Sequence, residues 1–236
     1  MTVACVVQAR LSSTRLPGKI LLDLAGRPVL SHVIERCRRI PGVDIVVCAV
    51  PDEKDSHLIE DFARLAGAST FRGSEFDVLA RTLGAARSVA ADIVVRVTSD
   101  CPLIDPDICG EVVAAVTERQ VDYASNVDPR SYPQGLDCEA FTIAALIMAD
   151  RATKASYDRE HCTTFMRRPV ANLRRHNIRT GRPDLADKRW TLDWPEDMAF
   201  FRAVHANGDP QSIDDVLAIL AAHPEIEAIN AMRKVT

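Results

Sequence analysis

Short apolar runs alternate along the chain with stretches in which apolar residues recur at helical spacing. The runs Val3 to Val7, Ile45 to Val50 and Ile93 to Val97 lack the alternation of a half-exposed strand. Continuous runs of this kind are typical of parallel strands that are covered on both faces. After the first two runs, apolar residues return every three or four positions over 29–40 and 58–66. This β-α-β-α order predicts a Rossmann-like α/β fold of three layers, with a mostly parallel sheet between helices.

The second half of the chain is less regular. A helix is predicted near 106–118 and a strand near 121–125, and then Pro129, Pro133 and Gly135 indicate a loop or hairpin excursion. Further helices are predicted near 142–151, near 158–167, around Glu196 and over 213–222, with one more strand near 172–178. No internal repeat, low-complexity segment or linker interrupts the pattern, so we expect one domain over residues 1–236.

Composition and charge narrow the classes of partner. The formal net charge of −4 gives no general attraction to nucleic acid or to an anionic membrane surface. Neither a signal-peptide pattern nor an apolar stretch of transmembrane length is present. The seven cysteines are scattered and never spaced as C-x-x-C, which favours buried free thiols over a disulfide framework, a zinc site or a nucleophile. We therefore expect a cytoplasmic protein that acts on small molecules.

The strongest chemical signal follows the first predicted strand. The segment 8–19 reads Q-A-R-L-S-S-T-R-L-P-G-K, and open α/β sheets bind ligands beyond the carboxyl ends of their strands. Arg10, Arg15 and Lys19 supply cations between hydroxyl side chains, a combination that suits the phosphoryl oxygens of a triphosphate. The segment is neither a P-loop nor a G-x-G-x-x-G turn, so ATPase and dehydrogenase activities lose their main support. The simpler alternative is a solvated basic loop.

The run A-R-x-x-S-T-R-L-P-G-K within this segment resembles the signature of cytidylyltransferases that make CMP-activated sugars. These are the CMP-KDO and CMP-acylneuraminate synthetases and, above all, their spore-coat polysaccharide biosynthesis relatives, to which nearly the whole chain is similar. The resemblance implies a fold of the nucleotide-diphospho-sugar transferase type. It also implies that the loop binds the phosphates of CTP through Ala9, Arg10, Ser13, Arg15 and Lys19, with the three cations acting in catalysis.

Two acidic residues are candidate metal ligands. Asp100 follows the apolar run 93–97 in the sequence R-V-T-S-D-C-P-L, where a carboxylate would face the ligand crevice. Asp193 lies in W-T-L-D-W-P-E-D, where it closes a short predicted strand before a helix. From the residues alone, a turn former and a helix N-cap are the respective alternatives. The resemblance implies that both aspartates bind Mg²⁺ beside CTP, and that Asp100 is catalytic.

Two further segments match the spore-coat branch, and a third resembles a segment of the family as a whole. The resemblance places Y-P-Q-G-L-D-C-E at 132–139 and D-R-E-H at 158–161 on the acceptor side. It likens R-G-S-E-F-D-V-L-A-R at 72–81 to a nucleotide-specificity segment. A hairpin turn, a solvated helix face and a helix cap at Ser74 are the alternatives from the residues alone. The implied acceptor-binding residues are Gln134, Asp137, Glu139, Arg159, Glu160 and His161, and those implied for the base or ribose are Arg72, Asp77 and Arg81.

These features predict that an acceptor hydroxyl attacks the α-phosphorus of CTP in line with departing pyrophosphate. We expect an acidic sugar as the acceptor, while an ulosonic acid, another acidic sugar and a phosphorylated polyol stay open. The alternatives are a catalytically silent nucleotide-binding protein and a glycosyltransferase, for whose D-x-D motif Asp105 and Asp107 have the letters. Asp105 is otherwise expected to cap the next helix. A homodimer is expected if the excursion near 126–139 reaches across a two-fold axis.

Overall fold

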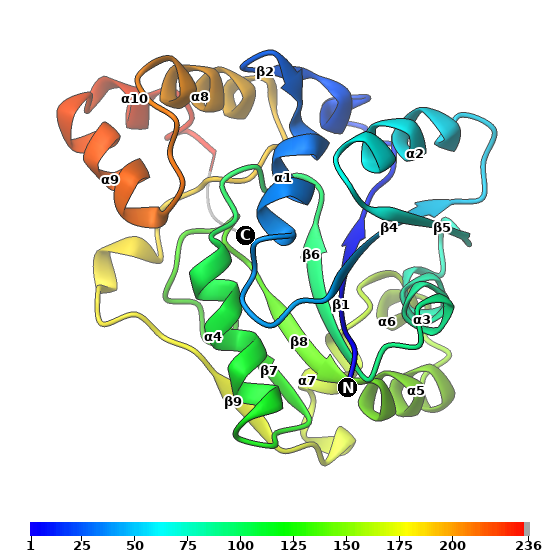
Figure 1. Cartoon of the computed structure of the whole chain (residues 1–236). Coiled ribbons are helices and arrows are strands. Elements are labelled where there is room, and N and C mark those ends of the chain that lie inside the picture. The colour runs from blue at the N-terminus through cyan, green and yellow to red at the C-terminus, as the bar shows by residue number, and fades with distance from the viewer. Residues whose placement is uncertain (234–236) are drawn as a thin grey trace.

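A seven-stranded sheet forms the centre of the computed structural model, which describes residues 1–233 (Figure 1). Its strand order is β5-β4-β1-β6-β8-β7-β9, and of the strands described in it only β8 runs antiparallel to its neighbours. The mostly parallel sheet is thus as predicted. The strands are β1 Val3–Gln8, β4 Ile45–Pro51, β5 Ser69–Gly73, β6 Ile93–Thr98, β7 Tyr123–Ser125, β8 Glu139–Thr142 and β9 Arg175–Asn177, with a separate pair β2 Asp23–Leu24 and β3 Arg27–Pro28.

Helices cover both faces of the sheet. The first face carries α1, α2 and α4, and the second carries α3 and α5, while α8, α9 and α10 gather beside β2 at the top of Figure 1. The helices are α1 Val29–Cys37, α2 Ser56–Leu65, α3 Val78–Ser88, α4 Pro106–Thr117, α5 Ile143–Ala152, α6 Ser156–Glu160, α7 Thr164–Arg167, α8 Pro195–Ala206, α9 Ile213–Ala222 and α10 Glu225–Ala228, with short 3₁₀ turns η1 Lys19–Leu21, η2 Pro169–Ala171 and η3 Pro183–Leu185.

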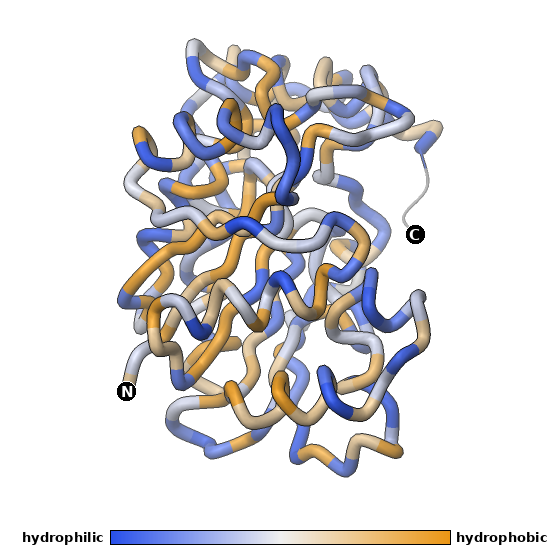
Figure 2. Tube along the Cα trace, turned by 90° about the vertical axis from the view of Figure 1, so that its right-hand side faces the viewer, coloured by the Kyte–Doolittle hydropathy of each residue, from blue (hydrophilic) through white to orange (hydrophobic). Residues whose placement is uncertain are grey.

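The alternating side chains of the strands separate two hydrophobic cores. Along β1, Val3, Cys5 and Val7 join the core under α1 and α4, whereas Ala4 and Val6 join the core under α3 and α5. Figure 2 shows apolar segments running through the interior, with hydrophilic residues mostly in the outer loops. Because the central strands are buried on both faces, their sequences are apolar without a period of two. The predicted three-layer arrangement is confirmed.

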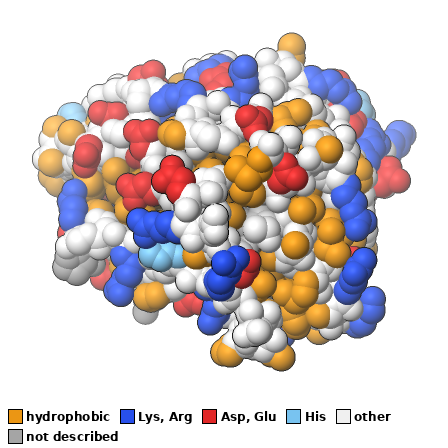
Figure 3. Space-filling model, turned by 60° about the horizontal axis from the view of Figure 1, so that its bottom comes forward, with side chains coloured by type: hydrophobic (Ala, Val, Ile, Leu, Met, Phe, Trp, Pro, Cys, Tyr) orange, Lys and Arg blue, Asp and Glu red, His pale blue; other side chains and the backbone are white. Residues whose placement is uncertain are grey.

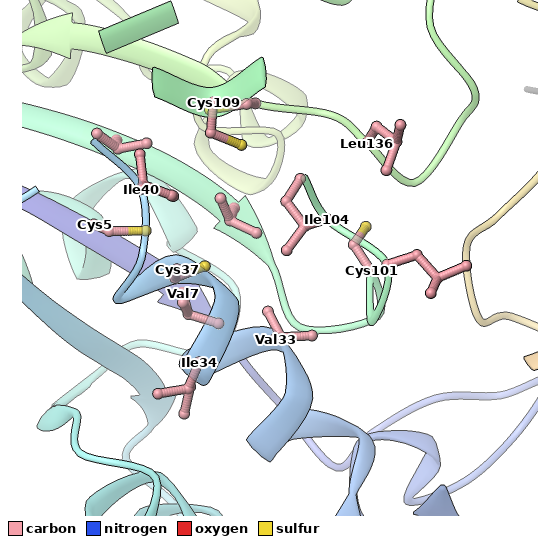
Figure 4. Close-up of a cluster of buried hydrophobic side chains, with 14 of the residues drawn as sticks. Cys5, Val7, Val33, Ile34, Cys37, Ile40, Cys101, Ile104, Cys109 and Leu136 are labelled. Carbon is pink, nitrogen blue, oxygen red and sulfur yellow. The ribbon is translucent and has the colours of Figure 1, made fainter. Parts of the chain in front are cut away.

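The cysteines belong to these cores. All seven are buried and unpaired, and Figure 4 shows Cys5, Cys37, Cys101 and Cys109 among apolar side chains of the first core. Burial raises the pKa of the Cys48 thiol to about 12, so this thiol stays neutral at physiological pH. The cysteines thus pack as small apolar residues, as predicted.

Three predicted elements differ from the structure. The helix expected over 158–167 is divided into α6 and α7, because Cys162 between them has a φ of 50° that no α-helix accommodates. The short strand expected to end at Asp193 is absent, since residues 190–193 form no strand pairing. The strand expected over 172–178 is shorter, with only Arg175–Asn177 paired to β7.

The excursion between β7 and β8 folds back onto its own chain. Asn126 ties its two sides together, because its side-chain amide donates to the Leu136 carbonyl (2.7 Å) and accepts from the Cys138 N–H (2.9 Å). The Gln134 carbonyl accepts from the Trp190 N–H at 2.6 Å. Gly135 has a φ of +109°, and a Cβ atom there would lie 2.1 Å from the Trp190 carbonyl oxygen. The excursion therefore docks beside the segment that leads to Asp193.

The outside of the molecule carries charges of both signs. On the face that comes forward in Figure 3, basic and acidic side chains are interspersed with apolar ones, in keeping with 29 basic and 33 acidic residues in the chain. Within residues 1–233, none of the helices has the length and apolar character needed to cross a membrane.

Candidate active site

The loop after β1 folds over the carboxyl edge of the sheet. It closes through the Gly18 N–H, which donates to the Leu11 carbonyl at 3.2 Å, and the Ser13 hydroxyl accepts from the Leu16 N–H at 3.3 Å. Gly18 has a φ of 66°, a left-handed conformation that glycine adopts without strain. The chain then enters η1, which turns the Lys19 side chain back toward the ends of β1 and β6. The sequence P-G-K thus positions Lys19 by backbone geometry.

A cavity of about 640 Å³ lies under this loop. Its walls come from the loops after β1, β5 and β6, from the end of α6 and from the segment before α8. Of the residues predicted for the site, those that line it are Ala9, Arg10, Ser13, Arg15, Lys19, Arg81, Asp100, Glu160, His161 and Asp193. The cation-rich loop and both candidate metal ligands therefore face one space, although Asp193 is far from the loop in sequence.

Lys19 connects the two candidate metal ligands. Its ammonium lies 2.6 Å from Asp100 Oδ2 and 2.9 Å from Asp193 Oδ1, and it also donates to the Leu192 carbonyl at 2.7 Å. Burial alone would lower the pKa of Lys19, but the two carboxylates raise it above its usual value. Lys19 therefore carries its charge between two acids, and the predicted proximity of Asp100 and Asp193 is present in the structure.

Asp193 is held by three cations. Besides Lys19, Arg15 approaches Oδ1 at 2.7 Å and Arg189 approaches Oδ2 at 2.9 Å. Burial would raise the pKa of the Asp193 carboxyl, but Lys19, Arg189 and Arg15 together lower it to about 2. The Arg15 guanidinium also lies 5.3 Å from the centre of the Trp194 ring. Asp193 thus remains an anion under all physiological conditions.

Asp193 does not cap α8, contrary to the alternative considered from sequence. Asp197, which is fully buried, accepts from the backbone N–H groups of Asp193 and Trp194, both at 2.9 Å. The carboxylate of Asp193 is thereby left for the cavity. Asp105 does cap α4 as predicted, and its other oxygen accepts from the Ile213 N–H at 2.7 Å. Asp105 and Asp107 line neither cavity described here, so the D-x-D letters lose their support for glycosyl transfer.

The two carboxylates around Lys19 are suitable ligands for Mg²⁺. This ion usually binds one or two protein carboxylates and takes its remaining ligands from water and substrate phosphates. Asp100 and Asp193 supply two such carboxylates, which already converge on one cation, the Lys19 ammonium. Within the described part of the chain, no group of three or more His, Cys, Asp or Glu residues forms a complete metal site. The arrangement therefore fits a metal that arrives together with a phosphate ligand.

The predicted nucleotide-specificity segment contributes Glu75, Val78 and Arg81 to the cavity, and of these only Arg81 was predicted to bind the base or ribose. Arg81 lines it and is 3% exposed, held by the carbonyls of Ser74 and Glu75, with its pKa lowered by burial and by Arg10. Arg72 lies outside, because it pairs with Glu60 on α2 at 2.6 Å. Neither Arg72 nor Asp77 lines the cavity, and their contact with the base or ribose stays a prediction.

The cap of α3 explains the position of Asp77. This residue, and not Ser74 as expected, is the N-cap, since its carboxylate accepts from the Ala80 N–H at 2.9 Å. The same carboxylate pairs with Arg159 at 2.6 Å, and Arg159 also pairs with Asp150 at 2.9 Å. Arg159 was predicted to bind the acceptor, but it lines neither cavity and is paired with Asp77 and Asp150 instead. Asp77 and Arg159 thus form a structural pair that fixes α6.

A second cavity of about 440 Å³ adjoins the first. Four of the residues predicted to bind the acceptor line it, namely Gln134, Asp137, Glu139 and His161. The two cavities share Arg96, Thr98 and His161. The docked excursion supplies one wall and α6 and α7 supply another, so the break at Cys162, which turns the chain between α6 and α7, shapes this space.

Three arginines of the second cavity were missed by the sequence reasoning. Arg96, on β6, donates to Glu139 at 2.6 Å and to Gln8 at 3.1 Å. Arg130 forms a two-pronged pair with Asp137, at 2.5 and 3.0 Å. Arg96 has a sequence signal, because it interrupts the apolar run I-V-V-R-V, where a charge requires a buried partner. Arg130 and the third, Arg167, have no such signal.

The carboxylate of Glu139 has a largely internal role. It is 4% exposed and accepts from the Tyr123 hydroxyl at 2.5 Å as well as from Arg96. Burial would raise its pKa, but Arg96 and Arg167 lower it below the usual value. Arg167 approaches Glu139 only to 4.0 Å, and its side chain is 35% exposed. Arg167 is therefore the arginine of this cavity whose charge is least neutralised by its described neighbours.

Comparison with known proteins agrees with this geometry. A family model described as cytidylyltransferase matches residues 4–221. The spore coat polysaccharide biosynthesis protein SpsF of Bacillus subtilis is 27% identical over 93% of this chain and 94% of its own length. A 3-deoxy-manno-octulosonate cytidylyltransferase of Anaeromyxobacter sp. (strain K) is 37% identical over 48% of this chain and 47% of its own.

A solved structure extends the similarity to three dimensions. A cytidylyltransferase from Leptospira borgpetersenii serovar Hardjo-bovis matches with a TM-score of 0.89 and 30% identity, covering 96% of each chain. The predicted family and fold are therefore confirmed. The structure has a cation-rich loop and two cavities that meet at a seam formed by Arg96, Thr98 and His161. Together with the matches, these features establish that the chain belongs to the cytidylyltransferase family of nucleotidyltransferases.

Proposed function

We propose that this protein transfers CMP from CTP to an acidic sugar, with Mg²⁺ bound and pyrophosphate released. The observation that carries the proposal is the pair of cavities that meet at Arg96, Thr98 and His161. One cavity places the loop cations Arg10, Arg15 and Lys19 beside the carboxylates of Asp100 and Asp193, and the other is rich in arginine. Two substrates seated in these cavities would meet at the shared seam, which a group transfer between them requires.

The first cavity suits the triphosphate. Arg10, Arg15 and Lys19 would bind phosphoryl oxygens, with the Ser13 hydroxyl and the backbone at Ala9 beside them. In the structure Arg15 and Lys19 are paired with Asp193. We propose that both transfer to the phosphates when CTP binds, because arginine forks and ammonium groups form strong charge-assisted hydrogen bonds with phosphate.

The two freed carboxylates would then hold the metal. Asp100 and Asp193 are the residues that would bind Mg²⁺, which supplies charge stabilisation for phosphoryl oxygens when present. Lys19, which lies between both acids in the structure, would remain beside them and next to the phosphates. It would neutralise negative charge that grows on the departing pyrophosphate, a contribution that positioned cations commonly make in phosphoryl and nucleotidyl transfer.

The second cavity suits an anionic acceptor. Arg130 and Arg96 are each paired with a carboxylate, at Asp137 and Glu139, whereas the charge of Arg167 is only weakly compensated. An acceptor carboxylate at Arg167 would complete the charge balance of the cavity. A hydroxyl of the same sugar, directed to the seam, would attack the α-phosphorus of CTP, forming the P–O bond as the bond to pyrophosphate breaks. Its proton would leave to solvent or a bound base.

The names of relatives support a sugar acceptor. One is a 3-deoxy-manno-octulosonate cytidylyltransferase and another acts in spore coat polysaccharide biosynthesis. We propose that this chain serves surface polysaccharide or glycan synthesis in the cytoplasm, where its seven free thiols would stay reduced. Two expectations stay predictions. One is a single domain over residues 1–236, of which 234–236 lie outside the described residues, and the other is a homodimer.

The test is a pyrophosphate-release screen of the four nucleoside triphosphates against acidic and neutral sugars. We expect turnover with CTP and an acid such as 3-deoxy-manno-octulosonate, and little turnover with neutral sugars. Arg167→Gln should raise the KM of the acidic sugar while the KM of CTP stays the same. Arg179→Gln is the matched control, since Arg179 is exposed and lines neither cavity. Equal KM values in wild type and Arg167→Gln would remove Arg167 from the acceptor site.

A further inference from the structure

A buried ion-pair network lies behind Asp193, on the side away from the first cavity. The centre of this network is Arg189, which is 7% exposed and lines neither of the two substrate cavities. Its guanidinium donates to Asp193 Oδ2 at 2.9 Å, to Asp197 Oδ2 at 3.2 Å and to Gln134 Oε1 at 3.2 Å. One planar side chain therefore joins a candidate metal ligand, a helix start and the acceptor wall.

The two oxygens of Asp193 have different partners. Oδ1 faces the cavity and contacts Lys19 and Arg15, whereas Oδ2 contacts Arg189. If Lys19 and Arg15 move to the phosphates of CTP, Arg189 is the described cation that stays on the carboxylate. Because a guanidinium bond to Oδ2 fixes the rotation of the carboxylate, Oδ1 remains directed at the cavity.

The network is itself anchored. Asp197 is fully buried and accepts from the backbone N–H groups of Asp193 and Trp194, so it fixes the main chain that carries the ligand. Asn230, which follows α10, donates to Asp197 Oδ1 at 3.0 Å and to the Arg189 carbonyl at 3.2 Å. Asn230 supports Asp193 only indirectly, through Asp197 and Arg189.

We propose that Arg189 is a positioning residue that orients Asp193 for the metal. The inference rests on the proposed function, in which Asp193 binds Mg²⁺ beside CTP. Residues that hydrogen-bond a ligating carboxylate orient it, and their loss commonly weakens metal binding 10- to 100-fold. Arg189 thus contributes to metal affinity without touching nucleotide or acceptor. Its bond to Gln134 also links the acceptor wall to the same carboxylate.

The experiment measures CTP binding by calorimetry in saturating Mg²⁺ and in EDTA, without acceptor. The ratio of the two dissociation constants is the metal-dependent gain in affinity. Arg189→Lys keeps the charge but loses the planar fork, so we expect this gain to fall about 10- to 100-fold while binding in EDTA stays at the wild-type level. In Arg189→Met/Asp197→Asn both buried charges are removed together, which avoids leaving one unpaired. The same loss is expected there.

Asn230→Ala is the matched control for a merely structural role. It should lower the melting temperature but keep the wild-type gain, because the Arg189–Asp193 bond remains. A wild-type gain in both Arg189 variants, with the gain lost in Asp193→Asn, would overturn the positioning role and leave the proposed function standing. The positioning role would also be overturned if the metal-dependent gain fell as much in Asn230→Ala as in Arg189→Lys. A wild-type gain in Asp193→Asn would overturn the proposed metal site itself.

Discussion

Replacing Lys19 by methionine tests whether one ammonium group holds the two candidate metal ligands together. Methionine keeps most of the length and removes the charge. In the structure the ammonium contacts Asp100 at 2.6 Å and Asp193 at 2.9 Å, and the side chain is 13% exposed. Without it, two carboxylates face each other across an uncharged tip. We expect the ligand-free variant to be less stable than the wild type, and Mg²⁺ to compensate.

The expected loss of unfolding free energy follows from the pKa of the Asp193 carboxyl. Its pKa falls from 3.8 to about 2, and each pKa unit corresponds to about 1.4 kcal/mol. Lys19 lowers this pKa together with Arg189 and Arg15, while burial raises it and solvent in the open cavity screens the charges. The contribution of Lys19 to the free energy of unfolding is therefore about 1 kcal/mol. Because the folded-state pKa is depressed, this contribution is complete at neutral pH and is lost as the pH falls from about 4 to about 2.

Urea unfolding at pH 7, in EDTA and in Mg²⁺ without nucleotide, measures the effect. We expect Lys19→Met to unfold at lower urea in EDTA and to regain stability in Mg²⁺, while the wild type changes little. Lys154→Met is the control, because Lys154 is exposed and lines neither cavity. Wild-type stability of Lys19→Met in EDTA, or equal stabilisation of both proteins by Mg²⁺, would refute the reasoning.

Three further predictions concern other parts of the molecule. CTP with Mg²⁺ should raise the melting temperature more than ATP or GTP, since a ligand at 100 times its Kd stabilises by about 2.7 kcal/mol; a larger shift with another nucleotide would contradict CTP specificity. Gly135→Ala should destabilise by at least about 2 kcal/mol in urea unfolding, because its Cβ would lie 2.1 Å from the Trp190 carbonyl oxygen. Gly181→Ala is the control and should not destabilise the protein, because a Cβ atom at Gly181 would have no heavy atom within 4 Å apart from the glycine itself and its two chain neighbours. Equal destabilisation by the two substitutions would contradict the docking of the excursion. Burial and His32 lower the pKa of His205 from 6.5 to about 4, so the unfolded chain binds this proton more readily and stability falls as the pH drops from about 6.5 to about 4. His205→Phe should remove about 1–2 kcal/mol of that fall in melts at pH 7 and pH 5, and an unchanged pH dependence would show that His205 is not responsible.

The sheet and its ligand edge were predictable because they depend on local pattern. Continuous apolar runs identify strands buried on both faces, and the cation-rich segment follows the first of them. The proximity of Asp100 and Asp193 was expected only from the family resemblance, since no local pattern joins residues 93 positions apart. The structure explains it through Lys19, which contacts both.

Other features could not be read from the sequence because they depend on distant partners. Asp197 has the pattern of a solvated first-turn acid, yet it is fully buried, since Arg189 and Asn230 satisfy it. Arg159 pairs with Asp77 across 82 positions, and neither residue lines the two cavities, so their predicted contacts with the substrates stay predictions. The division of the helix over 158–167 follows from one left-handed residue, Cys162, whose side chain gives no such signal. The sequence therefore did not predict which distant charges pair or which residue adopts a left-handed backbone conformation.

The products of the reaction test the central claim most directly. Phosphorus NMR of the protein with CTP, Mg²⁺ and 3-deoxy-manno-octulosonate would follow every phosphorus atom. We predict equal amounts of pyrophosphate and of one new phosphodiester that contains CMP and the sugar, with neither formed by Asp193→Asn. Cleavage of CTP to CDP and phosphate without a phosphodiester, or unchanged CTP with each acidic sugar in the screen, would contradict cytidylyl transfer to an acidic sugar.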